Sequence, residues 1–364
     1  MKVGILTHYD VNNQGAQLQM YGLYNQLKKL GHTPKVLSYV KNFDFERESA
    51  LKYQVSIKSI PYYIKHYLFE KGLGSTWFNY KKYNKNKEFR KNNFIIENYS
   101  SADIDCAIVG SDEVWSIPYG VNDMMYGHCV NTDNMISYAP AFGQTDMEMI
   151  NKYHAKELIS SGISKFKAIS ARDVHTYNMV KELTGREAEI VCDPVLYYDF
   201  SDTKVEVDLP SKKYIIVYSY EWNMNDESEI KAIKEYAKKN NLITVSVGTY
   251  HKWCDKNIYC NALEWIEYFR GAEAVITDTF HGAIVSIITH TKMAVFVRGL
   301  NVNKLTDLLD RTNNSNRRLK SISIEEIERV FNTEPNFDKV DEALADLREN
   351  ANNFLINALN SIEN

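Results

Sequence analysis

The chain has 364 residues, of which 44% are hydrophobic and 25% charged, and its formal net charge is −4. This length suits two domains of roughly 150–180 residues each, and the composition excludes a mainly disordered or fibrous chain. The slightly acidic charge supplies no basic field for nucleic acid, so we expect no nucleic-acid partner. Five cysteines without a Cys-x-x-Cys pair indicate reduced thiols rather than a disulfide framework.

The N-terminus reads as a first buried strand and not as a targeting segment. Its apolar run, Val3 to Leu6, is too short for a signal peptide. No window approaches the ~20 uncharged apolar residues that a membrane-spanning helix needs. We therefore expect a cytoplasmic protein, with at most a peripheral contact to the inner face of the membrane.

The first half of the chain alternates apolar runs with segments of helical spacing. A strand at 3–6, a helix from Ala16 to Leu30 closed by Gly31, and a strand near Val36 form a βαβ unit. Further buried strands are predicted at 107–109, 135–138, 168–170 and 190–192. We expect an α/β domain over residues 1–196.

The same alternation resumes after a linker at 196–212 that lacks periodicity. Strands are predicted at 214–218, 242–247, 274–277 and 293–297, with helices at 229–239 and 282–289. A second α/β domain over 213–335 would be followed by an amphipathic helix over 337–362. Two successive, mostly parallel sheets leave a cleft between them.

Residues 51–95 depart from this pattern and look like an insertion in the first domain. The segment carries ten Lys or Arg side chains against two acids, Glu70 and Glu88, with aromatic residues between them. One interpretation is a solvated helical face. The other is a surface that meets a lipid-linked acceptor at an anionic membrane.

Two motifs of the first domain follow predicted strands. The turn Asn12 to Gln17 could bind an anion or sugar hydroxyls through amides and helix N–H groups, or it could be a plain turn with an Asn cap. Gly-x-Gly-x-x-Gly is absent, which argues against a nicotinamide enzyme. Gly110 to Trp115 offers Asp112 as a general base, or Ser111 or Asp112 as a helix cap with Trp115 in the core.

Two further motifs offer cationic side chains. Arg172, in Ser170 to Asp173, could bind a carboxylate or phosphate, or it could form a surface pair with Asp173. His281 lies in the first turn of a predicted helix after a buried strand, where the helix dipole, backbone N–H groups and an imidazole converge on an anion or a developing oxyanion. The alternative is a capping histidine. Cys254, Cys260 and His251 match no common zinc spacing, so we expect no metal.

Together these motifs resemble the polysaccharide pyruvyl transferase family. The resemblance runs from Val3 to about Arg311, and its motifs are Gly4 to Thr7, Asn13 to Gln19, Gly110 to Trp115, Ser137 to Gly143, Ser170 to Asp173, Asp193 to Leu196, and Thr277 to Gly282. Their order and spacing agree with the family throughout. Asp173 stands where Glu is usual, and Glu113 where Gln is usual.

The resemblance implies a glycosyltransferase-B-like fold of two Rossmann-like domains, of which we expect the first to form the acceptor side of the site and the second the donor side. It also implies transfer of a pyruvyl group from phosphoenolpyruvate, as co-substrate, to two hydroxyls of a sugar or lipid-linked oligosaccharide in surface polysaccharide or cell-wall glycan assembly. No other cofactor is expected. A nucleotide-sugar glycosyltransferase and a non-catalytic sugar- or phosphate-binding protein remain alternatives.

The residues fit this chemistry in the following roles. His281 is the candidate acid, Asp112 the candidate base, and Arg172 the candidate partner of the donor's anionic groups. The remaining candidate substrate-binding residues are Asn13, Gln14, Gly15, Ser111, Thr279, Phe280, Gly282, Arg298 and Lys304.

Overall fold

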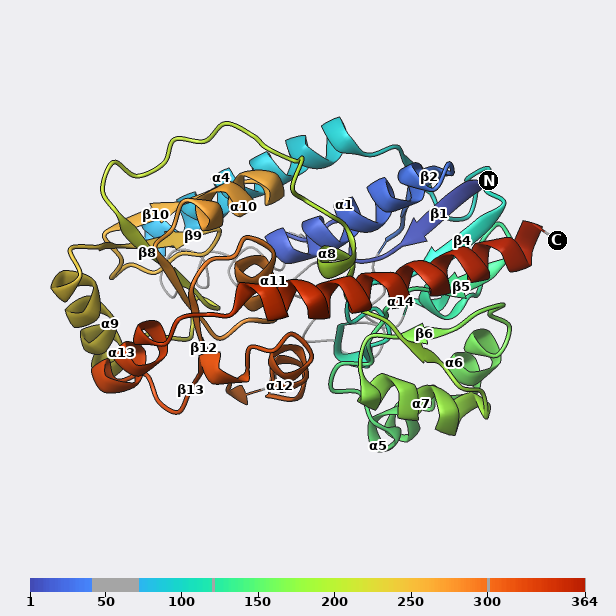
Figure 1. The fold of residues 1–364 in the computed structure, drawn as a ribbon. Coiled ribbons are helices and arrows are strands. Elements are labelled where there is room, and N and C mark those ends of the chain that lie inside the picture. The colour runs from blue at the N-terminus through green and yellow to red at the C-terminus, as the bar shows by residue number, and fades with distance from the viewer. Residues whose placement is uncertain (41–71, 120–121, 300–301, 364) are drawn as a thin grey trace.

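The computed structural model describes residues 1–40, 72–119, 122–299 and 302–363. Within these ranges the chain forms two α/β domains that lie side by side, each built on a parallel sheet (Figure 1). The two Rossmann-like domains predicted from the sequence are confirmed.

The N-terminal domain has a sheet in the order β3-β2-β1-β4-β5, all parallel. Its elements are β1 Lys2–Leu6, α1 Gln14–Lys29, β2 Thr33–Ser38, α4 Gly72–Asn93, β3 Ile96–Asn98, β4 Cys106–Val109, β5 Met135–Ser137, α5 Met147–Lys152, α6 Lys156–Ile163, β6 Ser170–Ala171, α7 Val174–Thr184, β7 Glu189–Ile190 and α8 Pro194–Tyr197. The strand predicted at 168–170 is wrong in its bounds. Ala168 makes only an isolated bridge to Ile136, and β6 pairs with β7 in a separate two-stranded sheet.

The C-terminal domain has a sheet in the order β10-β9-β8-β11-β12-β13, also parallel. Its elements are β8 Tyr214–Tyr218, α9 Glu227–Lys239, β9 Ile243–Val247, β10 Lys256–Ile258, α10 Ala262–Arg270, β11 Ala274–Thr277, α11 Phe280–Ile288, β12 Met293–Phe296, α12 Val302–Arg311, β13 Arg318–Leu319, α13 Ile324–Asn332 and α14 Phe337–Glu363. Helix α11 begins two residues before its predicted start, because the Thr279 side chain accepts a hydrogen bond from Gly282 N and so caps the helix.

Both sheets have the strand order of a doubly wound fold, with a reversal between the first and fourth strands. In such sheets ligands bind beyond the carboxyl ends of the strands at this reversal. Here the reversals lie between β1 and β4 and between β8 and β11. The loops after these four strands are therefore where the fold places a binding site.

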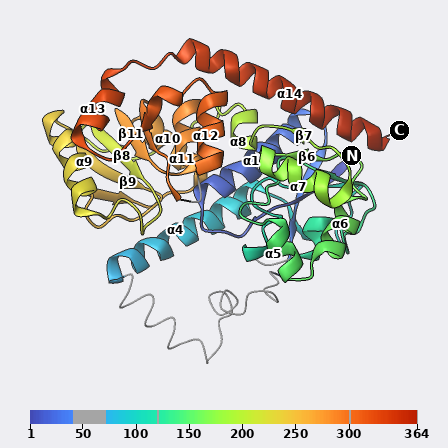
Figure 2. The same cartoon turned by 90° about the horizontal axis from the view of Figure 1, so that it is seen from below.

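Two long helices join the domains on opposite sides of the molecule (Figure 2). Helix α14 leaves the C-terminal domain and packs along the N-terminal one, where Arg348 donates to Leu196 O at 2.8 Å and Tyr197 donates to Asn352 at 2.9 Å. Its apolar stripe includes Phe354 and Leu355 and joins a core shared by both domains. The two walls of the cleft therefore rest on one continuous hydrophobic core.

Helix α4 is the described part of the predicted insertion, whose residues 51–71 lie outside the described ranges. It is not simply a solvated face, because several of its polar side chains cross to the C-terminal domain. Lys82 is buried and donates to Gly248 O at 3.0 Å, while Lys85 pairs with Glu264 at 2.7 Å. Arg90 is also buried and pairs with Asp10 at 2.7 Å. The outer side of the helix exposes Leu73, Trp77, Tyr80, Tyr83, Lys87 and Lys91.

Candidate active site between the domains

A cleft of about 970 Å³ separates the two domains. Its walls include the loops that follow β1, β4, β8 and β11, as the strand order requires. Of the residues predicted from the sequence, those that line it are Asn13, Gln14, Asp112, Arg172, Thr279, Phe280, His281, Arg298 and Lys304. The structure thus brings together side chains from sequence positions nearly 300 residues apart.

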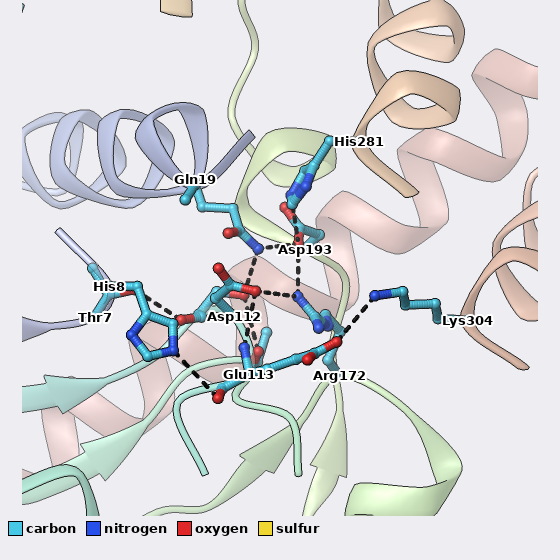
Figure 3. Close-up of polar contacts among 12 residues, drawn as sticks. Thr7, His8, Gln19, Asp112, Glu113, Arg172, Asp193, His281 and Lys304 are labelled. Atoms are coloured by element: carbon cyan, nitrogen blue, oxygen red, sulfur yellow. Dashed lines mark hydrogen bonds and ion pairs between the residues drawn. The ribbon is translucent and has the colours of Figure 1, made fainter. Parts of the chain in front are cut away.

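A buried guanidinium lies between two carboxylates at the centre of this site (Figure 3). Arg172 follows β6, and its side chain is 5% exposed. Its Nη1 lies 3.6 Å from Asp112 Oδ1 and 3.6 Å from Asp193 Oδ2. Its Nε and Nη1 make no hydrogen bond to any described residue, although both are buried. Buried donors without a hydrogen bond are costly inside a protein, and here the two carboxylates at ion-pair distance offset part of that cost.

Arg172 also stacks on an aromatic ring of the opposite domain. Its guanidinium carbon lies 5.3 Å from the centre of the Phe280 ring, and the Lys304 ammonium lies 5.9 Å from the same centre. Cation–π contacts of this kind hold the planar guanidinium in one orientation. The ring of Phe280 therefore contacts both cations, Arg172 and Lys304.

Asp193 contacts several groups of the site. The carboxylate is fully buried and accepts hydrogen bonds from Gln19 Nε2 at 2.6 Å and from Val195 N at 2.9 Å. Its Oδ2 also lies 3.8 Å from Nε2 of His281. A buried carboxylate behind an imidazole and a guanidinium orients both, so we assign Asp193 as a positioning residue.

His281 lies where the N-termini of two helices, α1 and α11, meet. It lies in the first turn of α11, and its ring packs directly against Gly15 in the first turn of α1. A Cβ built on Gly15 would lie 2.3 Å from the His281 ring, so only glycine fits there. The positive ends of both helix dipoles therefore point into one region of the cleft, which favours a bound anion.

The carboxylates of the site are held ionised. Burial alone would raise the pKa of Asp112, but Arg172, His8 and His281 lower it to about 2. Burial opposes the ionisation of Asp193 as well, and His281 and Arg172 bring its pKa below the usual value. Burial would lower the pKa of Arg172, whereas Asp112 and Asp193 raise it. The cluster is thus a cation between two anions at neutral pH.

A family model described as polysaccharide pyruvyl transferase matches residues 13–299. The chain belongs to this family. A sequence search of curated proteins found no match.

Solved structures that the chain resembles include several sugar-processing proteins. Glycosyltransferase SnogD from Streptomyces nogalater has 11% identity and a TM-score of 0.44, with 97% of this chain and 95% of that one covered. A putative UDP-N-acetylglucosamine 2-epimerase from Listeria monocytogenes has 10% identity and a TM-score of 0.48, with 94% and 91% covered. Scores this low carry no conclusion about the substrate of this polysaccharide pyruvyl transferase family member.

Three of the residues expected to bind substrate do not line the cleft. The Ser111 hydroxyl is buried outside the cleft, where it donates to Ala139 O at 2.9 Å and accepts from Gln19 at 3.2 Å. Gly282 does not line the cleft, because its N–H is taken by Thr279 and its Cα packs against Thr277 and Tyr218. Gly15 makes room for His281 and does not itself line the cleft. Ser111 and Gly282 thus lie outside the cleft lining, and Gly15 affects the cleft only through His281.

Other predicted residues line the cleft but already have partners. Asn13 caps α1, Thr279 caps α11, and Gln14 donates to Cys260 O of the opposite domain at 2.9 Å. Arg298 pairs with Asp278 at 2.9 Å and with Glu229 at 2.8 Å, and Lys304 pairs with Glu113 at 3.0 Å. Lys304 links the two walls and lies over the same Phe280 ring as Arg172.

The predicted alternatives for Arg172 and Asp112 are also resolved. Arg172 is not a surface partner of Asp173, because it is buried and Asp173 caps α7 through a hydrogen bond from Thr176 N. Asp112 caps no described helix; its backbone has a φ of 84°, and its side chain is 23% exposed toward the cleft. Trp115 is fully buried, as expected.

Sequence reasoning missed three groups at this site. His8 follows β1, lines the cleft, and has Nε2 3.3 Å from Glu113 O. Asp193 was noted only as part of a motif, although an aspartate directly after a predicted strand was the same signal that identified Asp112. Tyr220 and Trp222 follow β8 and also line the cleft. Among the described residues, no group of three or more His, Cys, Asp or Glu side chains is placed to hold a metal ion.

The contact between Gly15 and His281 yields a testable prediction. Gly15→Ala should destabilise the fold by roughly 1–3 kcal/mol, the usual cost of overpacking, and displace the imidazole. The same substitution in a His281→Gly background should cost much less, because the ring and Cβ that it meets are gone. Thermal unfolding of the four proteins measures this coupling. Equal penalties in both backgrounds would show that the two residues do not press on each other.

Proposed function

We propose that this protein transfers the pyruvyl group of phosphoenolpyruvate to two hydroxyls of a glycan as a cyclic ketal. The family resemblance suggests the reaction, and the observation that carries the proposal is the buried Arg172, with N–H groups that lack a hydrogen-bond partner among the described residues, beside His281 at two helix N-termini. A small ligand with two anionic groups suits this arrangement.

The reaction balances with the groups present. The central carbon of the donor loses its bond to the phosphate oxygen and its π bond to the methylene carbon, and it gains two bonds to acceptor oxygens. The donor's methylene carbon gains one proton and becomes a methyl group. Two hydroxyl protons leave the acceptor, so one replaces the proton supplied to carbon and the other leaves with phosphate.

The residues fit defined roles in these steps. Arg172, stacked on Phe280, binds an anionic group of the donor in a two-pronged geometry. His281 supplies the proton to the methylene carbon, and Asp193 holds its ring in place. Asp112 takes a hydroxyl proton. A bound anionic donor adds negative charge beside Asp112 and raises its low pKa, which is the direction that a base requires.

Isothermal titration tests the donor. We expect phosphoenolpyruvate to bind the wild-type chain and nucleotide sugars not to compete with it. Binding of a nucleotide sugar alone would favour a glycosyltransferase. Binding of phosphoenolpyruvate without turnover on any glycan would favour a non-catalytic binding protein.

We further propose that the protein works in surface polysaccharide or capsule assembly in the cytoplasm. There it would meet a lipid-linked acceptor at the inner membrane surface. None of the described helices is long and apolar enough to span a membrane. The outer face of α4 exposes Trp77 and Tyr80, whose rings stack at 5.8 Å, with Lys81 over Trp77 at 4.7 Å. Aromatic rings among lysines suit a membrane interface.

Vesicle co-sedimentation tests this contact. The protein should pellet with anionic vesicles at low salt and remain in solution with neutral ones, since each Lys near anionic lipid contributes about 1 kcal/mol. Changing Lys81, Lys87 and Lys91 to Gln should abolish binding. The same change at Lys231, Lys234 and Lys238, exposed on α9, is the matched control and should not. Equal partitioning to both vesicle types would contradict the proposal.

A further inference from the structure

Two aromatic rings in the C-terminal wall of the cleft have no role in the proposed chemistry. Tyr220 and Trp222 lie in the loop after β8, at the point where the strand order of this sheet reverses. Their rings are parallel, with an interplanar angle of 0° and centres 4.9 Å apart. Trp222 is 75% exposed, although it lines the cleft. Its large apolar surface is thus presented to whatever the cleft holds.

The loop that carries these rings is anchored on both sides. Asn223 donates to Asp278 at 2.7 Å, and Asp278 is in turn bound by Arg298. Glu221 accepts hydrogen bonds from Asn79 at 2.7 Å and from Ser75 at 3.1 Å, both on α4. Both residues that flank Trp222 in the chain are therefore anchored, and its own ring stacks on Tyr220. A tryptophan held in this way loses little conformational entropy on binding, which makes Tyr and Trp effective anchors.

The size of the cleft indicates an extended ligand. About 970 Å³ is at the upper end of the roughly 300–1,000 Å³ range of pockets that enclose drug-sized ligands. A three-carbon donor and one sugar ring need only part of it. The Tyr220–Trp222 stack belongs to the C-terminal wall, whereas Arg172 and Asp112 lie in the N-terminal wall.

Charge and surface chemistry favour a sugar over a nucleotide at this stack. Glu221 lines the cleft between the two aromatic residues, and its carboxylate disfavours a nearby phosphate. The same carboxylate accepts hydrogen bonds from hydroxyl groups. The C–H face of a sugar ring packs against an indole face, and its hydroxyls reach polar groups at the rim. A neutral glycan residue meets both requirements.

We propose that the Tyr220–Trp222 stack binds a second sugar residue of the acceptor, so that the enzyme acts on an oligosaccharide and not on a single sugar. This inference rests on the proposed function, because it assumes that the reacting sugar lies near Arg172 and His281. Trp222 is then a residue that sets acceptor length.

Glycan binding without donor tests this role separately from catalysis. The wild-type chain is first screened on an array of bacterial surface-glycan fragments, and the mono-, di- and trisaccharides of the strongest ligand are then titrated. We expect the di- and trisaccharide to bind tighter than the monosaccharide. Trp222→Ala should weaken their binding by about ten-fold or more, as loss of an aromatic anchor does. Trp222→Phe should retain most of the affinity, because it keeps a ring.

The outcomes separate this inference from the proposed function. Unchanged phosphoenolpyruvate affinity and unfolding temperature in Trp222→Ala, together with the loss of oligosaccharide preference, would support it. No glycan binding by the wild type, equal affinity for all three lengths, or a Trp222 effect on a nucleoside diphosphate instead would overturn it. Failure of phosphoenolpyruvate to bind would overturn the proposed function and leave the glycan result standing.

Discussion

Replacing Arg172 with methionine should destabilise the fold by about 3–5 kcal/mol and abolish phosphoenolpyruvate binding. The guanidinium is buried between Asp112 and Asp193, and its loss leaves two buried carboxylates without their cation. The free energy of unfolding in urea measures the first effect, and isothermal titration the second. Arg172→Lys is the conservative variant: it keeps the charge but not the planar fork, and should weaken donor binding by roughly 1.5–3 kcal/mol.

The pH dependence of the Arg172→Met effect has a definite sign. In the wild type the pKa of Asp112 is lowered to about 2, so its stabilisation is present above the unfolded value near 4 and is lost as pH falls toward 2. In the variant, burial without the cation raises the carboxyl pKa values. Acid then protonates these carboxylates and removes the free-energy cost of burying their charge. The stability gap between the two proteins should therefore shrink as pH falls through about 4 toward 2. A gap that stays constant with pH would show that Arg172 does not stabilise these carboxylates.

His281→Ala should lower turnover by about 100-fold or more while leaving the unfolding temperature nearly unchanged. A general acid contributes about this much to the rate. The His281 side chain is 14% exposed, and its Nε2 makes no hydrogen bond to a described residue, so the substitution removes the ring without breaking a hydrogen bond. Steady-state kinetics and thermal unfolding of one preparation measure both effects.

His290→Ala is the matched control for this substitution. His290 lies just beyond the opposite end of α11, is exposed, and pairs with Asp341 at 2.8 Å, away from the cleft. Its removal should leave turnover within a factor of two, roughly the spread expected for surface changes. If His281→Ala keeps activity within ~10-fold of the wild type, or loses stability as well as activity, the residue has a structural role and is not the acid.

The sheets and their cleft were predictable because buried parallel strands leave continuous apolar runs in the sequence. Asp112, Arg172 and His281 each follow the carboxyl end of a predicted strand, where α/β sheets bind ligands, so each could be named as a site residue from the sequence. These ends belong to three different sheets, and only the structure brings them to one cleft. The expectation that Arg172 meets a ligand anion stays a prediction, and the structure shows its buried guanidinium between Asp112 and Asp193.

The connections between domains were not predictable in the same way. The basic residues of α4 looked like one charged surface, yet Lys82, Lys85 and Arg90 are used within the molecule. Only their partners, which lie far away in the sequence, distinguish them from the exposed Lys87 and Lys91. Ser111 shows a second limit of sequence-based prediction, because a position after a strand does not tell which side chain faces the cavity. Asp112 lines the cavity, whereas the neighbouring Ser111 is buried in the core.

The most direct test of the central claim is glycan-dependent phosphate release from phosphoenolpyruvate. The purified chain is incubated with phosphoenolpyruvate and an oligosaccharide that it binds, and phosphate and modified glycan are measured together. We expect phosphate and ketal-bearing glycan to form in equal amounts, and both to fall by about 100-fold or more in His281→Ala. Phosphate release that does not depend on glycan, or consumption of a nucleotide sugar with phosphoenolpyruvate left intact, would contradict the account.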